Sequence, residues 1–217
     1  RSFEDFLDEQ DVPTLAGIDT RAITRKIRDN GMMKGVIVSD EASEAEIAEL
    51  LATPEIHDQI AQVTTKETYT VGEGKLHVAV LDLGLKKKVT NFLMGMDCHL
   101  TVFPASTSAE EILRHNPNGI VITNGPGNPA DVPEVIETVK ALMGKKSMLG
   151  FCMGHLVMAL ANGAGATKMK FGHHGNQPVK GLETGRVYIS AQNHGYVVDA
   201  ASLEGKDITL THVALND

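Results

Sequence analysis

Short apolar runs alternate with amphipathic stretches through the second two-thirds of the chain. The runs 77–81, 98–103 and 119–123 are rich in Val, Ile and Leu and have the length of buried strands. Between and after these runs the apolar positions recur with helical spacing, which predicts helices over 86–94, 108–115 and 131–143. Strands that alternate with helices predict an α/β fold, a doubly wound and mainly parallel sheet with helices on both faces.

The first quarter of the chain has a different pattern. It predicts helices over 2–10, 21–29 and 43–51 and a strand over 35–38. We therefore expect residues 1–52 to be part of a smaller N-terminal domain, residues 53–74 to be a polar linker, and residues 75–217 to form the α/β domain. The helix 21–29 has a basic face, which indicates either a solvated surface or a binding surface.

The most informative stretch lies around Cys152. The apolar run Met148–Phe151 predicts a buried strand, and Leu156–Ala161 has the composition of a helix. Gly150 and Gly154 flank the cysteine in the pattern G-x-C-x-G, which is typical of a nucleophile elbow with sulfur in place of oxygen. The positive end of the helix favours thiolate, and the N–H of Met153 would face a developing oxyanion. The alternative is a buried structural cysteine.

Two further segments are expected near this thiol. The turn Asn124–Pro129 follows the strand 119–123, and ligands of parallel sheets bind at the carboxyl ends of strands. Its Gly125 and Gly127 either form a simple tight turn or let backbone N–H groups face a ligand. Beyond the elbow, Gln192–Tyr196 is expected to be a loop, in which His194 is a candidate base for Cys152 or a residue that only shapes the pocket.

Composition narrows the classes of function. A formal net charge of −8 gives no support for binding nucleic acid or an anionic membrane. The two cysteines form no disulfide framework, and Cys98 lies in an apolar run, so we expect a cytoplasmic protein. No metal site is expected either, because His173 and His174 are adjacent on an extended segment and point to opposite faces.

These segments together resemble the small, glutamine-hydrolysing subunits of carbamoyl-phosphate synthases, which are class I (triad) glutamine amidotransferases with a flavodoxin-like fold. The stretches that carry the resemblance are Ala16–Arg21, Asn124–Pro129, Gly150–His155, Lys168–His174 and Gln192–Tyr196. The elbow fits any class I amidotransferase, whereas the first and fourth stretches are specific to this subunit.

The resemblance implies that Cys152 attacks the amide of glutamine and that water then releases glutamate and ammonia. It implies that Met153 and Gly127 hold the oxyanion. The residues that match glutamine-binding positions are Gly125, Gly127, Met153, Asn193, Gly195 and Tyr196. The ammonia would pass to a large synthetase subunit for arginine and pyrimidine biosynthesis. ATP and magnesium are expected only on that partner, and no cofactor is expected on this chain.

Two departures from the family pattern matter. The triad histidine and glutamate belong to a His-Pro-Glu stretch that does not occur in these residues, so the chain resembles a protein truncated at both ends and is expected to be a weak or inactive glutaminase. Leu156 also stands where the family has glutamine. One alternative is therefore a catalytically impaired docking subunit that gates ammonia delivery. Another is a different cysteine hydrolase on the same sheet, which would leave the matches outside the elbow unexplained.

Overall fold

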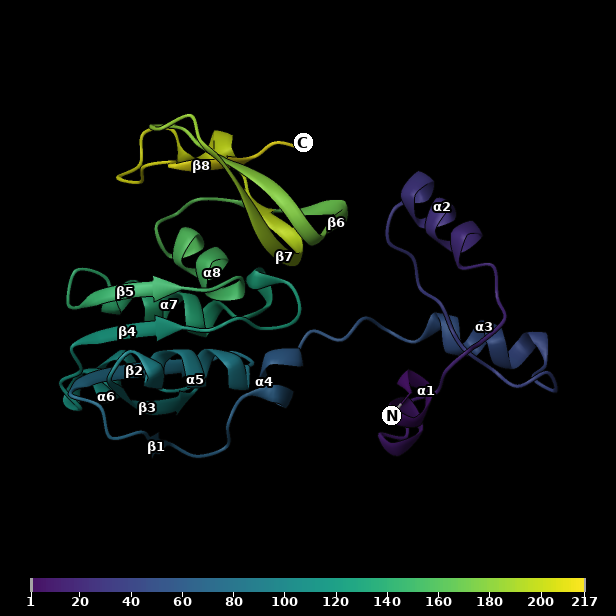
Figure 1. Cartoon of the computed structure of the whole chain (residues 1–217), viewed down its shortest axis with the longest axis horizontal. Helices are drawn as coiled ribbons and strands as arrows, with labels where there is room; N and C mark the ends of the chain where they lie inside the picture. Colours follow the sequence, from purple (N-terminus) through teal and green to yellow (C-terminus); the bar gives the residue numbers. More distant parts are fainter. Residues whose placement is uncertain (1, 217) are drawn as a thin grey trace. The chain divides into compact units, whose positions relative to one another are not determined.

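The computed structural model describes residues 2–216, and Figure 1 traces the course of the chain. The chain divides into two compact units, residues 1–55 and residues 56–217. The first contains three helices, α1 (Phe3–Glu9), α2 (Thr20–Asn30) and α3 (Glu44–Ala52). Capping boxes at Ser2 and Ser43 start α1 and α3: each serine pairs with an acidic residue three positions on. These three helices confirm the helices predicted in the first quarter of the sequence.

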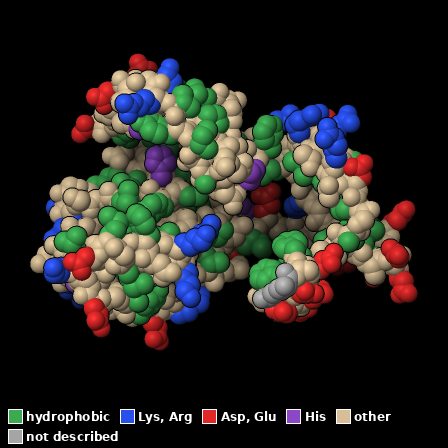
Figure 2. Space-filling model, viewed as in Figure 1, with side chains coloured by type: hydrophobic (Ala, Val, Ile, Leu, Met, Phe, Trp, Pro, Cys, Tyr) green, Lys and Arg blue, Asp and Glu red, His purple; other side chains and the backbone are tan. Residues whose placement is uncertain are grey.

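The first unit has little core of its own. None of its three helices has a buried residue. The strand expected over 35–38 does not form, because extended residues become a strand only when a partner pairs with their backbone groups. Lys and Arg side chains gather over α2, where the sequence has Arg21, Arg25, Lys26 and Arg28 (Figure 2).

The second unit is built on a five-stranded sheet with the order β1-β3-β2-β4-β5. The four strands β2 to β5 are parallel, and only β1 runs antiparallel to its neighbour. Their bounds are β1 (Tyr69–Val71), β2 (Leu76–Asp82), β3 (Cys98–Pro104), β4 (Gly119–Ile122) and β5 (Ser147–Gly150). The mainly parallel sheet predicted from the sequence is confirmed. The run before Cys152 is not fully buried, however, because β5 is an edge strand and Leu149 is 50% exposed.

Helices cover both faces of this sheet, as its strand composition predicts. One buried cluster joins Ala79 and Leu81 of β2 to residues of α6 (Ala109–Arg114), α7 (Pro133–Leu142) and α8 (Met153–Ala161). The other joins Val80 to Leu93 of α5 (Lys87–Gly95) and to Cys98. Successive residues of β2 thus enter opposite clusters, as the period of two of a strand requires. Cys98 is 6% exposed and is a core residue, as expected.

The two units meet between residues 55 and 56, whereas the sequence predicted a linker over residues 53–74. Within that stretch α4 (Gln59–Val63) brings Ile60 into the core, where it is 4% exposed. Strand β1 pairs with residues 100–102 at the edge of the sheet. Most of the polar segment is therefore part of the second unit rather than a connection to it.

A second, three-stranded antiparallel sheet follows α8 in the order β7-β6-β8. It is formed by β6 (Ala166–Gly181), β7 (Val187–Val198) and β8 (His212–Ala214), with the 3-10 turn η2 (Ala200–Leu203) between β7 and β8. Residues 192–196 were expected to be a loop, and that expectation is wrong: they are part of β7 and pair with β6. The Asn and Gly in this stretch favour turns, but cross-strand pairing outweighs that local preference.

Candidate active site

Cys152 stands between β5 and α8 with an uncommon backbone conformation. Its φ is 49° and its ψ is −106°. A non-glycine residue at positive φ costs about 1–3 kcal/mol and persists only where its surroundings enforce it. Such strain concentrates at functional sites, so the backbone of Cys152 supports the nucleophile elbow predicted from G-x-C-x-G.

Tight contacts with β4 enforce the elbow. The Phe151 N–H donates to the Ile122 carbonyl at 3.0 Å, and the Gly154 N–H donates to the Thr123 carbonyl at 2.9 Å. A Cβ on Gly154 would lie 2.2 Å from the Ile122 oxygen, and one on Gly150 would lie 2.6 Å from the carbonyl carbon of Gly154. Both positions therefore require glycine because backbone segments meet there.

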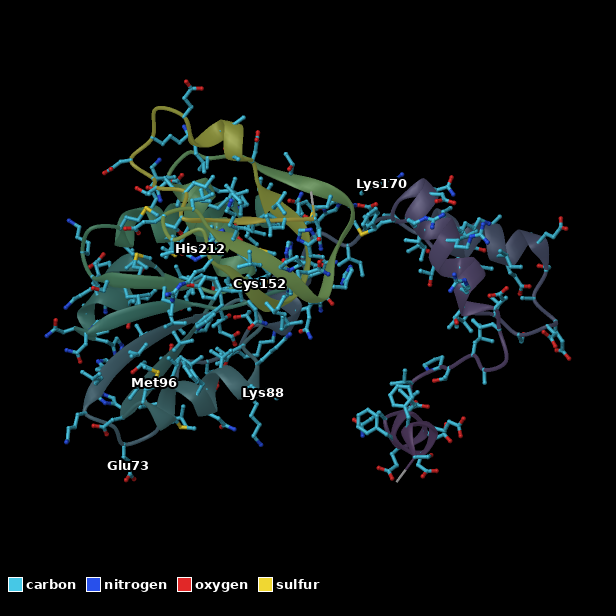
Figure 3. All side chains as sticks on the ribbon, turned by 45° about the horizontal axis from the view of Figure 1, so that its top comes forward. Glu73, Lys88, Met96, Cys152, Lys170 and His212 are labelled. Atoms are coloured by element: carbon cyan, nitrogen blue, oxygen red, sulfur yellow. The ribbon has the colours of Figure 1, made fainter. Side chains whose placement is uncertain are left out.

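The thiol is exposed at the N-terminus of the nine-residue helix α8. The positive end of the helix dipole favours an anion at this position. Figure 3 shows Cys152 where the layer of the five-stranded sheet meets the β6–β7 hairpin. The sulfur lies 3.9 Å from the carbonyl oxygen of Asn193 in β7, to which the S–H can donate. The alternative of a buried structural cysteine is wrong.

The turn Asn124–Pro129 leaves the sheet at the same level as Cys152. Ile122 and Gly150 are direct partners in the β4–β5 ladder. The turn begins two residues after Ile122, and Cys152 lies two residues after Gly150. Within residues 2–216, neither the Met153 N–H nor the Gly127 N–H donates to a backbone carbonyl. This edge of the sheet thus carries the exposed thiol of Cys152 and two backbone N–H groups without a backbone acceptor among the described residues.

The hairpin contains the other predicted residues. Asn193, Gly195 and Tyr196 all belong to β7, and Tyr196 pairs with Lys168 beyond an irregularity in the ladder. The Asn193 side-chain oxygen lies 2.9 Å from Nδ1 of His174. The Nε2 of His174 lies 3.0 Å from the Phe171 carbonyl oxygen, which can only accept, so this ring nitrogen carries a proton.

His174 contacts the predicted site residue Asn193, and the sequence analysis gave it no role at the site. It lies opposite Asn193 in the β6–β7 ladder. The contact with Asn193 follows from the ladder register, which depends on pairing between distant segments. His173 is buried and His174 is exposed, so adjacent histidines do face opposite sides of the strand, as predicted.

His194 is held within its own strand. Its Nδ1 lies 2.9 Å from the Tyr196 carbonyl oxygen and its Nε2 lies 2.8 Å from the side-chain oxygen of Gln192. A carbonyl only accepts, so Nδ1 carries a proton and Nε2 is engaged by the Gln192 amide. This geometry favours the pocket-shaping alternative for His194, because acting as a base for Cys152 would require breaking one of these bonds.

The first turns of α8 contain two further groups near the thiol. The Leu156 side chain is 6% exposed, so an apolar group is packed where the family has glutamine. The pKa of His155 is lowered from its ordinary value because neighbouring atoms remove water from the ring, although part of the residue reaches the surface. His155 is therefore a neutral group near the elbow at physiological pH.

In the part of the chain that the structure describes, no three or more His, Cys, Asp or Glu side chains are arranged to hold a metal ion.

Among residues 2–216, no helix is long and apolar enough to cross a bilayer.

Comparison with known proteins agrees with the geometry. Residues 79–217 match the family model of class-I glutamine amidotransferases, and residues 1–37 match the CPSase domain of the carbamoyl-phosphate synthase small chain. The carbamoyl phosphate synthase small chain of Bacillus cereus is 47% identical over 218 residues, and that of Oceanobacillus iheyensis is 45% identical over 218. Each alignment covers 100% of this chain, which spans 60% of the length of each relative.

A solved crystal structure has a similar fold. The crystal structure of a candidate GMP synthase component from Thermoplasma acidophilum superposes with a TM-score of 0.55 at 19% identity, covering 64% of this chain and 73% of the other. At this identity the likeness supports the fold alone. With a family model matching residues 79–217 and an elbow of the expected geometry, the chain belongs to the class-I glutamine amidotransferase family.

Proposed function

We propose that this chain is the glutamine-hydrolysing part of a carbamoyl-phosphate synthase small chain. The strained, exposed Cys152 at the start of α8 is the observation that carries this proposal. The match of residues 1–37 to the CPSase domain supports a synthase rather than another amidotransferase. The named relatives support the same choice, since they are carbamoyl phosphate synthase small chains.

In the proposed mechanism, the Cys152 thiolate attacks the side-chain carboxamide carbon of glutamine. The carbonyl oxygen gains negative charge, which the N–H groups of Met153 and Gly127 stabilise. Collapse of this intermediate breaks the C–N bond, and the nitrogen takes up a proton and leaves as ammonia. Water then cleaves the glutamyl thioester, which yields glutamate and restores the thiol.

The remaining predicted residues bind the substrate. Gly125 lets the Asn124–Pro129 turn approach the ligand, while Asn193, Gly195 and Tyr196 line the pocket from β7. The side chain of Asn193 is oriented by His174, which fixes where its polar atoms point. We assign His194 a pocket-shaping role because both of its ring nitrogens are engaged within β7.

The ammonia is consumed by a large synthetase subunit in this proposal, and the two chains form a heterodimer in the cytoplasm. ATP and magnesium bind to that partner, which supplies carbamoyl phosphate for arginine and pyrimidine biosynthesis. We expect residues 1–217 by themselves to hydrolyse glutamine slowly. A triad enzyme without its base loses several orders of magnitude in rate, and His194 is not positioned by its hydrogen bonds to serve as one.

Buried Leu156 favours a second candidate function, a docking subunit that gates ammonia but hydrolyses glutamine poorly. The complete polypeptide with its synthetase partner separates the two in one assay. Carbamoyl phosphate formed from glutamine as well as from ammonia supports the glutaminase. Activity with ammonia alone supports the docking subunit. Leu156→Gln is the matched variant, since it restores glutamine-dependent activity only if Leu156 is the cause of the impairment.

A further inference from the structure

Asp82 is a buried carboxylate to which the proposed mechanism gives no role. It ends β2 at the carboxyl edge of the sheet and is only 5% exposed. One side-chain oxygen accepts from the N–H groups of Gly84 at 2.8 Å and Leu85 at 2.6 Å. The other accepts from the Thr65 N–H at 2.8 Å. Burying a charge is costly unless hydrogen bonds compensate, and these three backbone donors are the compensation.

The same residue ties three segments together. The Thr64 hydroxyl donates to the Asp82 carbonyl at 2.7 Å and accepts from the Ala105 N–H at 2.9 Å. The residues after α4 are thus fixed to the ends of β2 and β3. The 83–85 loop is fixed by the side chain of Asp82. Asp82 is therefore the point where these segments of the second unit meet.

The Asn124–Pro129 turn is hydrogen-bonded to the 83–85 loop. The Asn124 side-chain N–H donates to the Gly84 carbonyl at 2.7 Å, and the Leu83 N–H donates to the Thr123 hydroxyl at 2.8 Å. The two backbone segments are closely packed, since a Cβ on Gly125 would lie 2.3 Å from the Leu83 oxygen. A shift of the 83–85 loop must therefore move the turn that carries Gly127.

We propose that Asp82 is a positioning residue for glutamine hydrolysis. Its carboxylate fixes the 83–85 loop, the loop fixes the Asn124–Pro129 turn, and the turn sets the direction of the Gly127 N–H toward the oxyanion. This role rests on the proposed function of the site. Asp82 would act without contact with the substrate, because it ends β2, which lies on the other side of β4 from β5 and Cys152.

The test compares Asp82→Asn with Thr101→Val in the complete protein with its synthetase partner. Asparagine keeps the size of Asp82 but has one acceptor oxygen, so either orientation of its amide leaves a buried N–H unpaired. Thr101 is a fair control because it is also buried, at 4% exposed, and its hydroxyl has a hydrogen bond to His77 of 2.8 Å within the sheet. Thr101→Val removes that bond without touching the loop or the turn.

For Asp82→Asn we expect kcat for glutamine to fall about 100-fold, as for a misplacement of about 1 Å in an active site. KM should change by less than about threefold, since the lost interaction belongs to the transition state. Amide hydrogen exchange at residues 83–85 and 124–128 should rise by about tenfold or more, while exchange in α7 stays unchanged. Thr101→Val should leave both kcat and the exchange of the turn at wild-type values.

An Asp82→Asn protein with wild-type kcat, or with unchanged exchange at 124–128, would overturn the positioning role. Loss of activity accompanied by a uniform rise in exchange would also overturn it, because that result describes general destabilisation. If the wild-type complex fails to hydrolyse glutamine, the proposed function falls. The exchange at 124–128 then decides by itself whether Asp82 holds the turn.

Discussion

The sulfur of Cys152 and the carbonyl oxygen of Asn193 lie 3.9 Å apart, although 41 positions separate the two residues in the sequence. One belongs to the elbow after β5 and the other to the antiparallel hairpin that follows α8. The candidate site therefore depends on the hairpin being packed against the edge of the parallel sheet. The motif supplies the thiol and the hairpin supplies its Asn193 neighbour, so the candidate site needs both.

The two cysteines should differ in reactivity. Cys152 is exposed at a helix N-terminus, whereas Cys98 is 6% exposed within β3. We expect iodoacetamide to alkylate Cys152 at least about tenfold faster than Cys98 in the folded protein, because exposed thiols near positive charge react first. Peptide mass spectrometry after a short reaction measures both sites, and urea-unfolded protein provides the control in which the difference disappears. Equal labelling in the folded state would contradict the elbow.

Gly154 should tolerate no side chain. Its Cβ would lie 2.2 Å from the Ile122 carbonyl oxygen, so Gly154→Ala must push α8 away from β4. We expect the free energy of unfolding to fall by about 3 kcal/mol, the upper range for overpacking a core. The control is Gly95→Ala in α5, where a Cβ meets nothing within 4 Å and alanine should be neutral or stabilising. Similar denaturant midpoints for both variants would show that the elbow is less tightly packed than described.

Stability should decline in mild acid partly because of His77. Partial burial of the ring lowers its pKa from the ordinary 6.5, and the charges of His99 and His115 add to the effect. Below pH 6.5 the unfolded chain then binds the proton more readily than the folded chain. His77 therefore does not reduce the free energy of unfolding above pH 6.5, where its ring is neutral in both states. As the pH falls from 6.5 toward the lower pKa of the folded state, the free energy of unfolding decreases.

Urea unfolding between about pH 8 and about pH 5 measures this decline. His77→Gln should make the free energy of unfolding depend less steeply on pH, since glutamine binds no proton in either state. A slope that is the same with and without His77 would contradict the assignment.

His174 should affect the binding of glutamine rather than the reactivity of the thiol. Its ring orients the Asn193 side chain through a contact of 2.9 Å. Loss of one such hydrogen bond costs about 1 kcal/mol, so His174→Ala in the complete protein should raise KM for glutamine about fivefold. Alkylation of Cys152 should be unchanged. His212→Ala is the matched control on the same sheet, since His212 pairs with Gly181, seven residues beyond His174 in β6. An equal rise in KM for both variants would count against the role of His174.

The local parts of this fold were predictable from the sequence. Runs such as 98–103 and capping residues such as Ser43 act within a few positions, and the helices and parallel strands they predict are present. The elbow was predictable for the same reason, because Gly150, Cys152 and Gly154 define it locally.

The errors concern pairing between distant segments. Tyr69–Val71 is only three residues long and becomes a strand by pairing with residues 100–102. Residues 192–196 have the composition of a turn but pair with β6. The stretch 35–38 has the composition of a strand and finds no partner among the described residues. Strand formation is decided by the partner as much as by the segment, and a single sequence does not reveal the partner.

Trapping the glutamyl thioester tests the central claim most directly. The complete protein is mixed with glutamine, quenched in acid within the first turnover, digested and analysed by mass spectrometry, with Cys152→Ser treated in parallel. The account predicts a glutamyl adduct on the peptide that contains Cys152, absent from the variant, together with loss of glutamine hydrolysis in the variant. An adduct on another residue, or hydrolysis that continues in Cys152→Ser, would contradict it.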